Sequence, residues 1–250
     1  MSNSKHLFGI VDSAQPKNLG QIGFGDPPSD VALVSCGQLA AVVGEAKDDY
    51  SVPEREDVLV HQKVLEIVME EHTVLPMRFG TIAPGESDVL ELLQSSYEDL
   101  LAEITRLRGT VEAGLKVFWL KEAVQREVEA KLGKIEDLKK EEDKKKAYEV
   151  AVKTGQIVQN IIEQWRERYT SSILKRLKPH AVDLRLNDVF GVQMLINSSF
   201  LLRKSAIEEF EHELEKVVQE FSDKLSFRYV APVPPYNFVN LKIELPWEKV

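Results

Sequence analysis

The chain has 250 residues, enough for two domains, and its 29% charged side chains and formal net charge of −9 disfavour binding to nucleic acid or to anionic lipid. The only cysteine, Cys36, excludes an internal disulfide and a CxxC zinc site, and we expect it to be a buried, inert thiol. We recognise neither a signal peptide nor an apolar run of transmembrane length, so we expect the protein in the cytoplasm or on a structure assembled there.

The first third of the chain predicts a small α+β arrangement. Residues 7–11 form a short apolar run, which we interpret as a strand, whereas residues 13–30 contain the glycines and prolines typical of a loop. Two further apolar runs, 31–35 and 39–43, are separated by residues 36–38. This pattern predicts a β-hairpin.

Two amphipathic helices are predicted next. The first runs from Pro53 to about His72, because apolar residues recur at helical spacing and a Ser-x-x-Glu capping box begins at Ser51. Residues 73–79 then switch to a short β-like run. A second helix is predicted over residues 86–108, where a following glycine serves as the C-cap.

The middle of the chain is dominated by helical sequence. After a predicted strand at residues 111–120, the helical pattern continues over residues 121–178, and a single helix of that length would extend about 87 Å. We therefore expect two halves that fold back on each other near residues 139–146. Nine basic and nine acidic residues within 121–149 indicate that the first half is a projecting helix with many charged side chains of both signs.

The last part of the chain returns to short elements. Residues 181–186 and 192–202 read as strands joined in a hairpin. A helix over residues 205–222, opened by a Ser-x-x-Glu capping box, and a strand over residues 225–230 follow.

This order of elements predicts an α+β protein of two domains. From residue 110 to residue 231 the order is β-α-β-β-α-β, which is ferredoxin-like with an enlarged first crossover. We assign residues 1–109 to an N-terminal α+β domain of related architecture. Residues 110–233 form the ferredoxin-like domain, with a helical insertion at about 121–178. Residues 234–250 form a C-terminal tail that docks as a strand or an extended arm.

The sequence carries no recognisable motif for catalysis, a cofactor or a metal. It has no phosphate-binding loop, no HExxH, no GxSxG and no EF-hand loop, and the GxxGxG that begins at Gly20 has the wrong spacing for a dinucleotide. We therefore expect a protein that is not an enzyme and binds no cofactor. No ligand-like spacing relates the five histidines, His6, His61, His72, His180 and His212, so we expect them to be scattered.

One group of residues leaves a catalytic or ligand-binding site open as an alternative. It consists of His61 and Glu66 on the first predicted helix and Arg78 just beyond it. A five-residue separation does not place His61 and Glu66 neatly on one helix face. Arg78 is a guanidinium within a predicted apolar strand. It either pairs with a helix carboxylate or reaches solvent at a sheet edge, or it binds a carboxylate or chain terminus of a partner.

Two segments resemble the signature of the gas vesicle GvpF/GvpL family. The first is TVLPMRFGT at residues 73–81, preceded by His61 and a V-L-E element. The second is PPYNFV at residues 234–239, similar to the family's P-P-Y-x-F-V near the C-terminus, and an opening strand of the F-G-I-V type also fits. Two motifs in the same order, roughly 155 residues apart, argue against coincidence, and the chain length favours the GvpF branch.

The resemblance implies an accessory or minor structural component of gas vesicles, the gas-filled protein organelles that give cells buoyancy. It implies a role in assembly through contact with the small hydrophobic shell protein GvpA, whose aggregation it would limit, and contacts with other accessory proteins. The implied location is the gas vesicle, with a soluble cytoplasmic pool during assembly. It carries over no catalytic residues. A ferredoxin-like small-ligand sensor or enzyme using the His61, Glu66 and Arg78 neighbourhood is the alternative.

Overall fold

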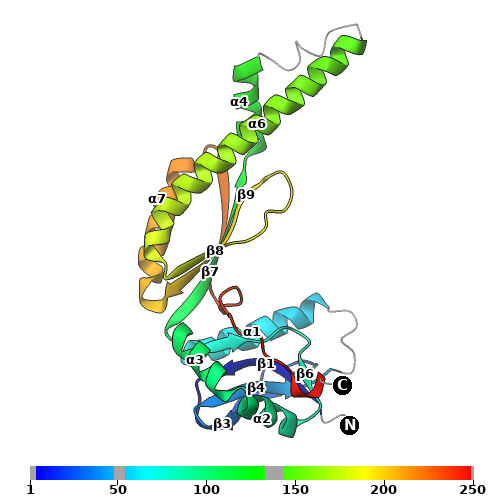
Figure 1. Cartoon of the computed structure of the whole chain (residues 1–250), viewed down its shortest axis with the longest axis vertical. Coiled ribbons are helices and arrows are strands. Elements are labelled where there is room, and N and C mark those ends of the chain that lie inside the picture. The colour runs from blue at the N-terminus through cyan, green and yellow to red at the C-terminus, as the bar shows by residue number, and fades with distance from the viewer. Residues whose placement is uncertain (1–3, 48–53, 133–143, 249–250) are drawn as a thin grey trace. The chain divides into compact units, whose positions relative to one another are not determined.

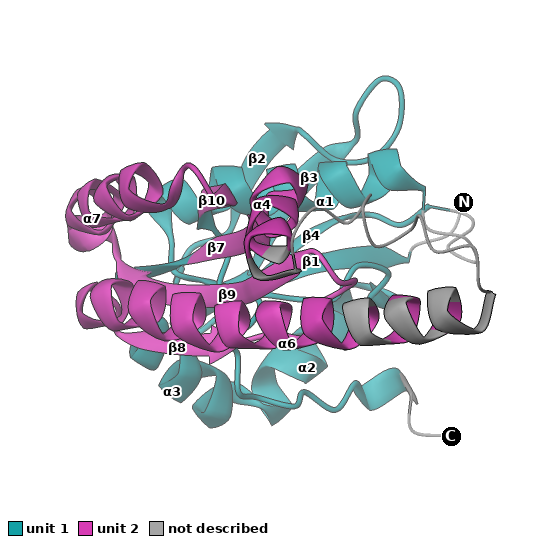
Figure 2. Cartoon of the chain, turned by 90° about the horizontal axis from the view of Figure 1, so that it is seen from above, with its two compact units in different colours: residues 1–112, 232–250 teal, residues 113–231 magenta. Residues whose placement is uncertain are grey.

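The computed structural model describes residues 4–47, 54–132 and 144–248 of the chain. It divides into two compact units: unit 1 holds residues 1–112 together with 232–250, and unit 2 holds residues 113–231 (Figure 2). Each unit has its own sheet and its own helices, so the predicted mixed α and β architecture is confirmed.

Unit 1 is built on a sheet with the strand order β2-β3-β4-β1-β5, and β6 pairs with β1 (Figure 1). The recorded pairings of this sheet are antiparallel. Its strands are β1 (Lys5–Val11), β2 (Lys17–Gln21), β3 (Asp30–Cys36), β4 (Leu39–Glu45), β5 (Val74–Pro76) and β6 (Ile82–Ala83). β1 and β4 are buried along nearly their whole length, which indicates that both faces of the sheet are covered.

Three helices accompany this sheet: α1 (Arg55–Glu71), α2 (Glu86–Ser95) and α3 (Tyr97–Leu107). α1 contacts β1 and β5, and α2 contacts β3 and β4. The prediction of a single helix over residues 86–108 is wrong, because the helix is interrupted at Ser96, which separates α2 from α3. The hydroxyl of Ser95 donates to the Leu92 carbonyl at 3.2 Å, the kind of local side-chain bond that competes with helix continuation.

Three other details of unit 1 differ from the sequence analysis. Residues 13–30 are not all loop, since β2 forms an edge strand there, and its exposed, polar residues carry no alternating apolar signal. β5 is much shorter than the predicted run over residues 73–79. It is an edge strand that ends at Pro76, which has no N–H to donate. Cys36 is partly exposed rather than buried.

Unit 2 is built on a second sheet with the strand order β10-β7-β9-β8, in which β8 and β9 are antiparallel. α6 packs against β9 and beside α7. The elements are β7 (Thr110–Trp119), α4 (Lys121–Leu132), α6 (Lys144–Leu177), η1 (Lys178–His180), β8 (Asp183–Leu186), β9 (Met194–Arg203), η2 (Lys204–Ala206), α7 (Ile207–Phe221) and β10 (Leu225–Val233).

The helix boundaries of unit 2 refine the prediction. Helical sequence over 121–178 becomes α4 and α6, and the turn expected near residues 139–146 falls partly on residues outside the described ranges, while Lys144 already belongs to α6. The prediction of a capping box at Ser205 is wrong, because η2 occupies this position. The N-cap residue of α7 is Ala206, which makes no side-chain hydrogen bond. The Ser205 box is a local sequence signal, and here a 3-10 turn forms in its place.

The capping box at Ser51 concerns a residue outside the described ranges, and Glu54 caps α1 without a side-chain hydrogen bond. The C-terminal tail forms no strand among its described residues; it ends in a short 3-10 turn, η3 (Pro246–Glu248), which contacts α2. The tail is therefore an extended arm that belongs to unit 1.

We predict that the β3–β4 hairpin depends on Gly37. This glycine has a φ of +61°, and a Cβ there would lie 2.5 Å from the hydroxyl oxygen of Tyr97, which accepts the Gln38 N–H at 2.9 Å. Gly37→Ala should therefore add backbone strain and displace Tyr97, lowering the free energy of unfolding by about 2–3 kcal/mol in urea denaturation.

Gly109→Ala is the matched control, because Gly109 has a similar φ of +69° but no atom within 4 Å of the added Cβ. Strain alone should cost about 1 kcal/mol there. Equal losses in the two variants would contradict the role given to Tyr97.

Candidate functional site

The three residues of the sequence-derived candidate site do not converge. His61 is buried on α1, whereas Arg78 is exposed in the connection that follows β5. Glu66 accepts a hydrogen bond from Gln62 at 2.7 Å, and its charge acts on Tyr236 of the C-terminal arm. Each side chain thus has a different environment.

What the structure does bring together is a pair of buried histidines. Nε2 of His6, on β1, lies 2.9 Å from Nδ1 of His61, and Nε2 of His61 lies 3.2 Å from the Met77 carbonyl oxygen. Since a carbonyl only accepts, His61 donates from Nε2 and accepts at Nδ1 from His6. This arrangement requires the His61 ring to be neutral, because a protonated Nδ1 could not accept.

Burial holds both rings in the neutral form. It lowers the pKa of His6 from 6.5 to about 3, and the neighbouring His61 adds to this effect. Burial likewise lowers the pKa of His61 to about 4, against the opposing hydrogen bond to Met77. We interpret this neutral pair as one that satisfies polar groups within the core.

Aromatic rings enclose this pair. The ring centroid of His6 lies 4.6 Å from Phe8, 4.8 Å from Phe24 and 5.6 Å from Phe79, and that of His61 lies 5.3 Å from Phe8. Phe79 and Met77 both come from TVLPMRFGT. The motif therefore closes one side of a buried cluster of unit 1.

Sequence reasoning missed this cluster, because it treated the histidines as scattered. One signal was present in α1: His61 precedes Val64, Leu65 and Val68 by three, four and seven residues, which places it on the buried stripe. His6 lies in a strand whose other residues are almost all apolar. Their mutual contact, across 55 residues of sequence, left no local pattern.

The second motif, PPYNFV, and the following Asn240 dock on two buried carboxylates of unit 1. The backbone N–H and the side-chain amide of Asn237 donate to Glu112 at 2.8 and 2.5 Å, and the backbone N–H of Asn240 donates to Glu103 at 2.6 Å. Arg106 binds Glu103 through two hydrogen bonds, at 2.8 and 2.7 Å, and also donates to the Phe238 carbonyl. Phe238 itself is fully buried.

Both motifs are therefore built into the core of unit 1, and exposed apolar surface lies elsewhere. Within unit 2, the connection from β8 to β9 forms a wide loop away from the sheet (Figure 1). Three of its large apolar side chains, and that of Leu186 at the end of β8, are exposed. They are Leu186 (61%), Val189 (38%), Phe190 (72%) and Val192 (72%), and we call them the apolar loop.

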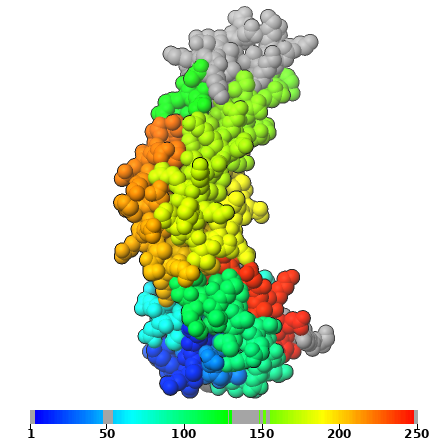
Figure 3. Space-filling view, turned by 60° about the vertical axis from the view of Figure 1, so that its left-hand side comes forward, coloured from blue at the N-terminus to red at the C-terminus, as the bar shows by residue number. Residues whose placement is uncertain are grey.

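The apolar loop is anchored at its base. The N–H of Asn187 donates to the Asn197 carbonyl at 2.8 Å, and the Asn197 amide donates to the Asp188 carbonyl at 2.7 Å. On the other side, the indole N–H of Trp119 donates to the Val192 carbonyl at 2.7 Å. In the space-filling view the yellow residues of this region reach the surface (Figure 3). The backbone is thus held while the apolar side chains face solvent.

Across the described ranges, no group of three or more His, Cys, Asp or Glu side chains is arranged to hold a metal ion. A search of the same residues finds no helix with the length and apolar character needed to cross a membrane.

Comparisons with known proteins agree over nearly the whole chain. Residues 4–240 match a family described as gas vesicle synthesis protein GvpL/GvpF. Gas vesicle protein F of Streptomyces sp. (strain CB03234) is 32% identical over 241 residues, covering 94% of this chain and 99% of the relative. Gas vesicle protein F of Dolichospermum flosaquae is 27% identical over 248 residues, covering 96% and 99%.

A solved structure shows a similar fold. The crystal structure of gas vesicle protein GvpF from Anabaena sp. PCC7120 superposes with a TM-score of 0.77 at 26% identity. The match covers 96% of this chain and 100% of that one.

We predict that acid destabilises the protein through the histidine pair. Because the pKa values of about 3 and about 4 lie below the ordinary 6.5, the unfolded chain binds more protons than the folded chain between pH 6.5 and about pH 4. The free energy of unfolding should fall as the pH drops through this window, by up to about 2 kcal/mol per histidine at pH 5.

Urea denaturation at a series of pH values checks this expectation. The double variant His6→Leu/His61→Leu should show a flatter dependence between about pH 6.5 and pH 5, where most carboxylates remain ionised. His212→Gln, at an exposed position, should keep the original slope. An unchanged slope in the double variant would show that other groups take up the protons.

Proposed function

The chain belongs to the GvpL/GvpF family of gas vesicle synthesis proteins, and we propose that it acts in gas vesicle assembly by binding the hydrophobic shell subunit GvpA and limiting its aggregation. The family that the two sequence motifs indicated is confirmed. We place the protein at the gas vesicle, with a cytoplasmic pool during assembly and with other accessory proteins as further partners.

The apolar loop is the observation that carries this proposal. Soluble chains rarely leave several large apolar side chains exposed within a few residues unless they bind something. Asp188 is the only charged residue between Asn187 and Gln193, in a chain whose formal net charge is −9. A surface of this kind suits a partner that is itself strongly apolar, because each covered side chain contributes about 1.5–3 kcal/mol.

A non-enzymatic role fits the candidate residues better than the alternative of a ligand sensor or enzyme. His61 is neutral and enclosed by rings, Glu66 acts electrostatically on Tyr236 of the C-terminal arm, and Arg78 is exposed. No common site joins them, and this dispersal argues against chemistry that needs all three.

Arg78 is proposed as a secondary contact. Its backbone carbonyl accepts from the hydroxyl and the N–H of Thr81, which holds the turn while the guanidinium points to solvent. An exposed guanidinium on a fixed turn suits a carboxylate of a partner.

We further propose that unit 2 is a ferredoxin-like domain with an enlarged first crossover. Its order of strands and helices and its sheet order, β10-β7-β9-β8, support this description. We keep the domain boundary near residue 110 and count the tail of residues 234–250 with the N-terminal domain, since its contacts are to unit 1.

Light scattering of purified shell subunit tests the proposed function. Added in equimolar amount, the wild-type protein should suppress aggregation, and Phe190→Ser/Val192→Ser should weaken the interaction about tenfold or more because two exposed apolar anchors are lost. Arg78→Ala should have a smaller effect, on the order of a few-fold.

The matched control is Val58→Ser/Leu59→Ser, which removes two exposed apolar side chains from α1. It should suppress aggregation as well as the wild type does. The proposal would be wrong if wild-type protein left aggregation unchanged. If the loop variant and the control behaved alike, the apolar loop would lose its assigned role.

A further inference from the structure

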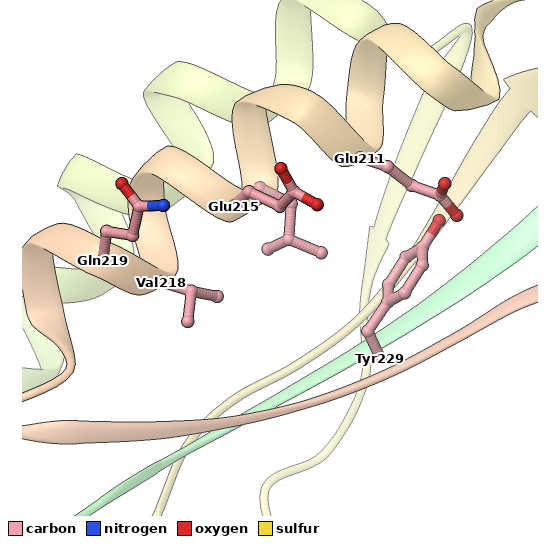
Figure 4. A pocket seen from close by; sticks show the side chains of 6 residues that line it. Glu211, Glu215, Val218, Gln219 and Tyr229 are labelled. Atoms are coloured by element: carbon pink, nitrogen blue, oxygen red, sulfur yellow. The ribbon is translucent and has the colours of Figure 1, made fainter.

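A second surface of unit 2 has a different chemistry, and it lies between α7 and the edge strand β10. This groove encloses about 570 Å³ and is lined by Glu211, Leu214, Glu215, Val218, Gln219 and Tyr229. Figure 4 shows the side chains of α7 on one side and Tyr229 of β10 on the other. We call it the α7–β10 groove.

Helical spacing produces a groove with an apolar floor and an acidic rim. Glu211, Leu214, Glu215 and Val218 follow one another at intervals of three and one residues, so they share one face of α7. Leu214 is almost fully buried and Val218 partly so, whereas Glu215 is exposed. The groove can therefore take an apolar side chain at its base and a charged one at its rim.

The two rim carboxylates differ from three other carboxylates of α7 in lacking a cation. Within the described part of the chain, no Lys, Arg or His lies within ion-pair distance of Glu211 or Glu215. Three other carboxylates of the helix are paired: Glu209 with His180 at 3.1 Å, Glu213 with Arg176 at 2.7 Å and with Lys216 at 3.2 Å, and Glu220 with Arg176 at 2.5 Å. The acidic charge of α7 thus remains uncompensated at the groove.

Tyr229 adds a donor to the same site. Its hydroxyl points toward the Glu211 carboxylate (Figure 4). Burial, and then the charge of Glu211, raise the pKa of Tyr229 above its usual range, so the phenol stays protonated.

β10 supplies a free strand edge beside the groove. It is the terminal strand of its sheet and pairs only with β7 on the recorded strand path. Its alternating burial places Tyr229 on the α7 side and Arg228 and Val230 on the other. An edge with unpaired N–H and C=O groups next to a side-chain groove is the arrangement by which sheets bind extended peptides.

We infer that the α7–β10 groove binds an extended segment of the shell subunit, which adds as a strand to β10 and places a Lys or Arg side chain beside Glu211 and Glu215. The identity of the partner rests on the proposed function, whereas the chemistry of the segment rests on the groove. Apolar residues beside the basic one would cover Leu214 and Val218.

The dimensions of the two elements match. Two carboxylates one helical turn apart are separated by about 6 Å along α7. Side chains on one face of a strand recur about every 6.6 Å. A strand alongside β10 could therefore place a basic side chain at the carboxylates and its next same-face neighbour over the apolar floor.

Overlapping peptides that tile the shell subunit, together with the intact subunit, test the inference by fluorescence polarisation with the full-length protein. Wild-type protein should bind peptides in which a Lys or Arg is flanked by apolar residues, and rising salt should weaken the binding. Glu211→Lys/Glu215→Lys should weaken binding at least about tenfold, because the charge pairing becomes repulsive. Changing that Lys or Arg of the peptide to Glu should restore binding to this variant.

Glu163→Lys/Glu167→Lys is the matched control. It makes the same charge change on two exposed glutamates four residues apart on α6 of the same unit. It should bind within about twofold of wild type, and equal thermal unfolding of both double variants shows that each is folded.

The outcomes separate the two ideas. If wild-type protein bound the intact subunit and Glu211→Lys/Glu215→Lys bound it equally well, the groove would be excluded and the proposed function would stand. If both double variants lost binding alike, general charge rather than the groove would be responsible, and the inference would be overturned. If wild-type protein bound neither the subunit nor any peptide, both proposals would fail.

Discussion

Unit 1 depends on two buried carboxylates that hold the end of the chain. Glu103 and Glu112 are 9% and 4% exposed, and a carboxylate with so little water needs partners for its charge. Asn237 and Asn240 supply backbone N–H donors, and Arg106 neutralises Glu103 while it also holds the Phe238 carbonyl. The chain must therefore leave unit 1, complete residues 113–231, and return before unit 1 has all its hydrogen bonds.

This constraint explains why the two family motifs share one unit although roughly 155 residues separate them. PPYNFV donates to Glu112 through Asn237, Asn240 just beyond it donates to Glu103, and TVLPMRFGT closes the histidine cluster through Phe79 and Met77. Both motifs are thus explained by the packing of unit 1. Segments that identify the family need not be those that meet its partner, and the apolar loop and the α7–β10 groove both lie in unit 2.

How far the sequence could predict this structure depended on whether the signal was local. The β3–β4 hairpin was predicted correctly, because two apolar runs flank Gly37, whose positive φ suits the turn. β2 was missed, because an exposed edge strand has no apolar alternation. The proximity of His6 and His61 and the docking of Asn237 on Glu112 were also missed. Such contacts join residues 55 and 125 apart and leave no periodic trace.

Hydrogen exchange of the full-length protein, alone and with purified shell subunit, tests most directly whether unit 2 meets the partner. We expect the subunit to slow exchange in residues 186–193 and along β10, where a new strand would occupy free backbone groups. Exchange at residues 236–238 should be unchanged, because the N–H groups of these residues are already bonded within unit 1. Unchanged exchange throughout unit 2, with new protection confined to unit 1, would contradict this assignment.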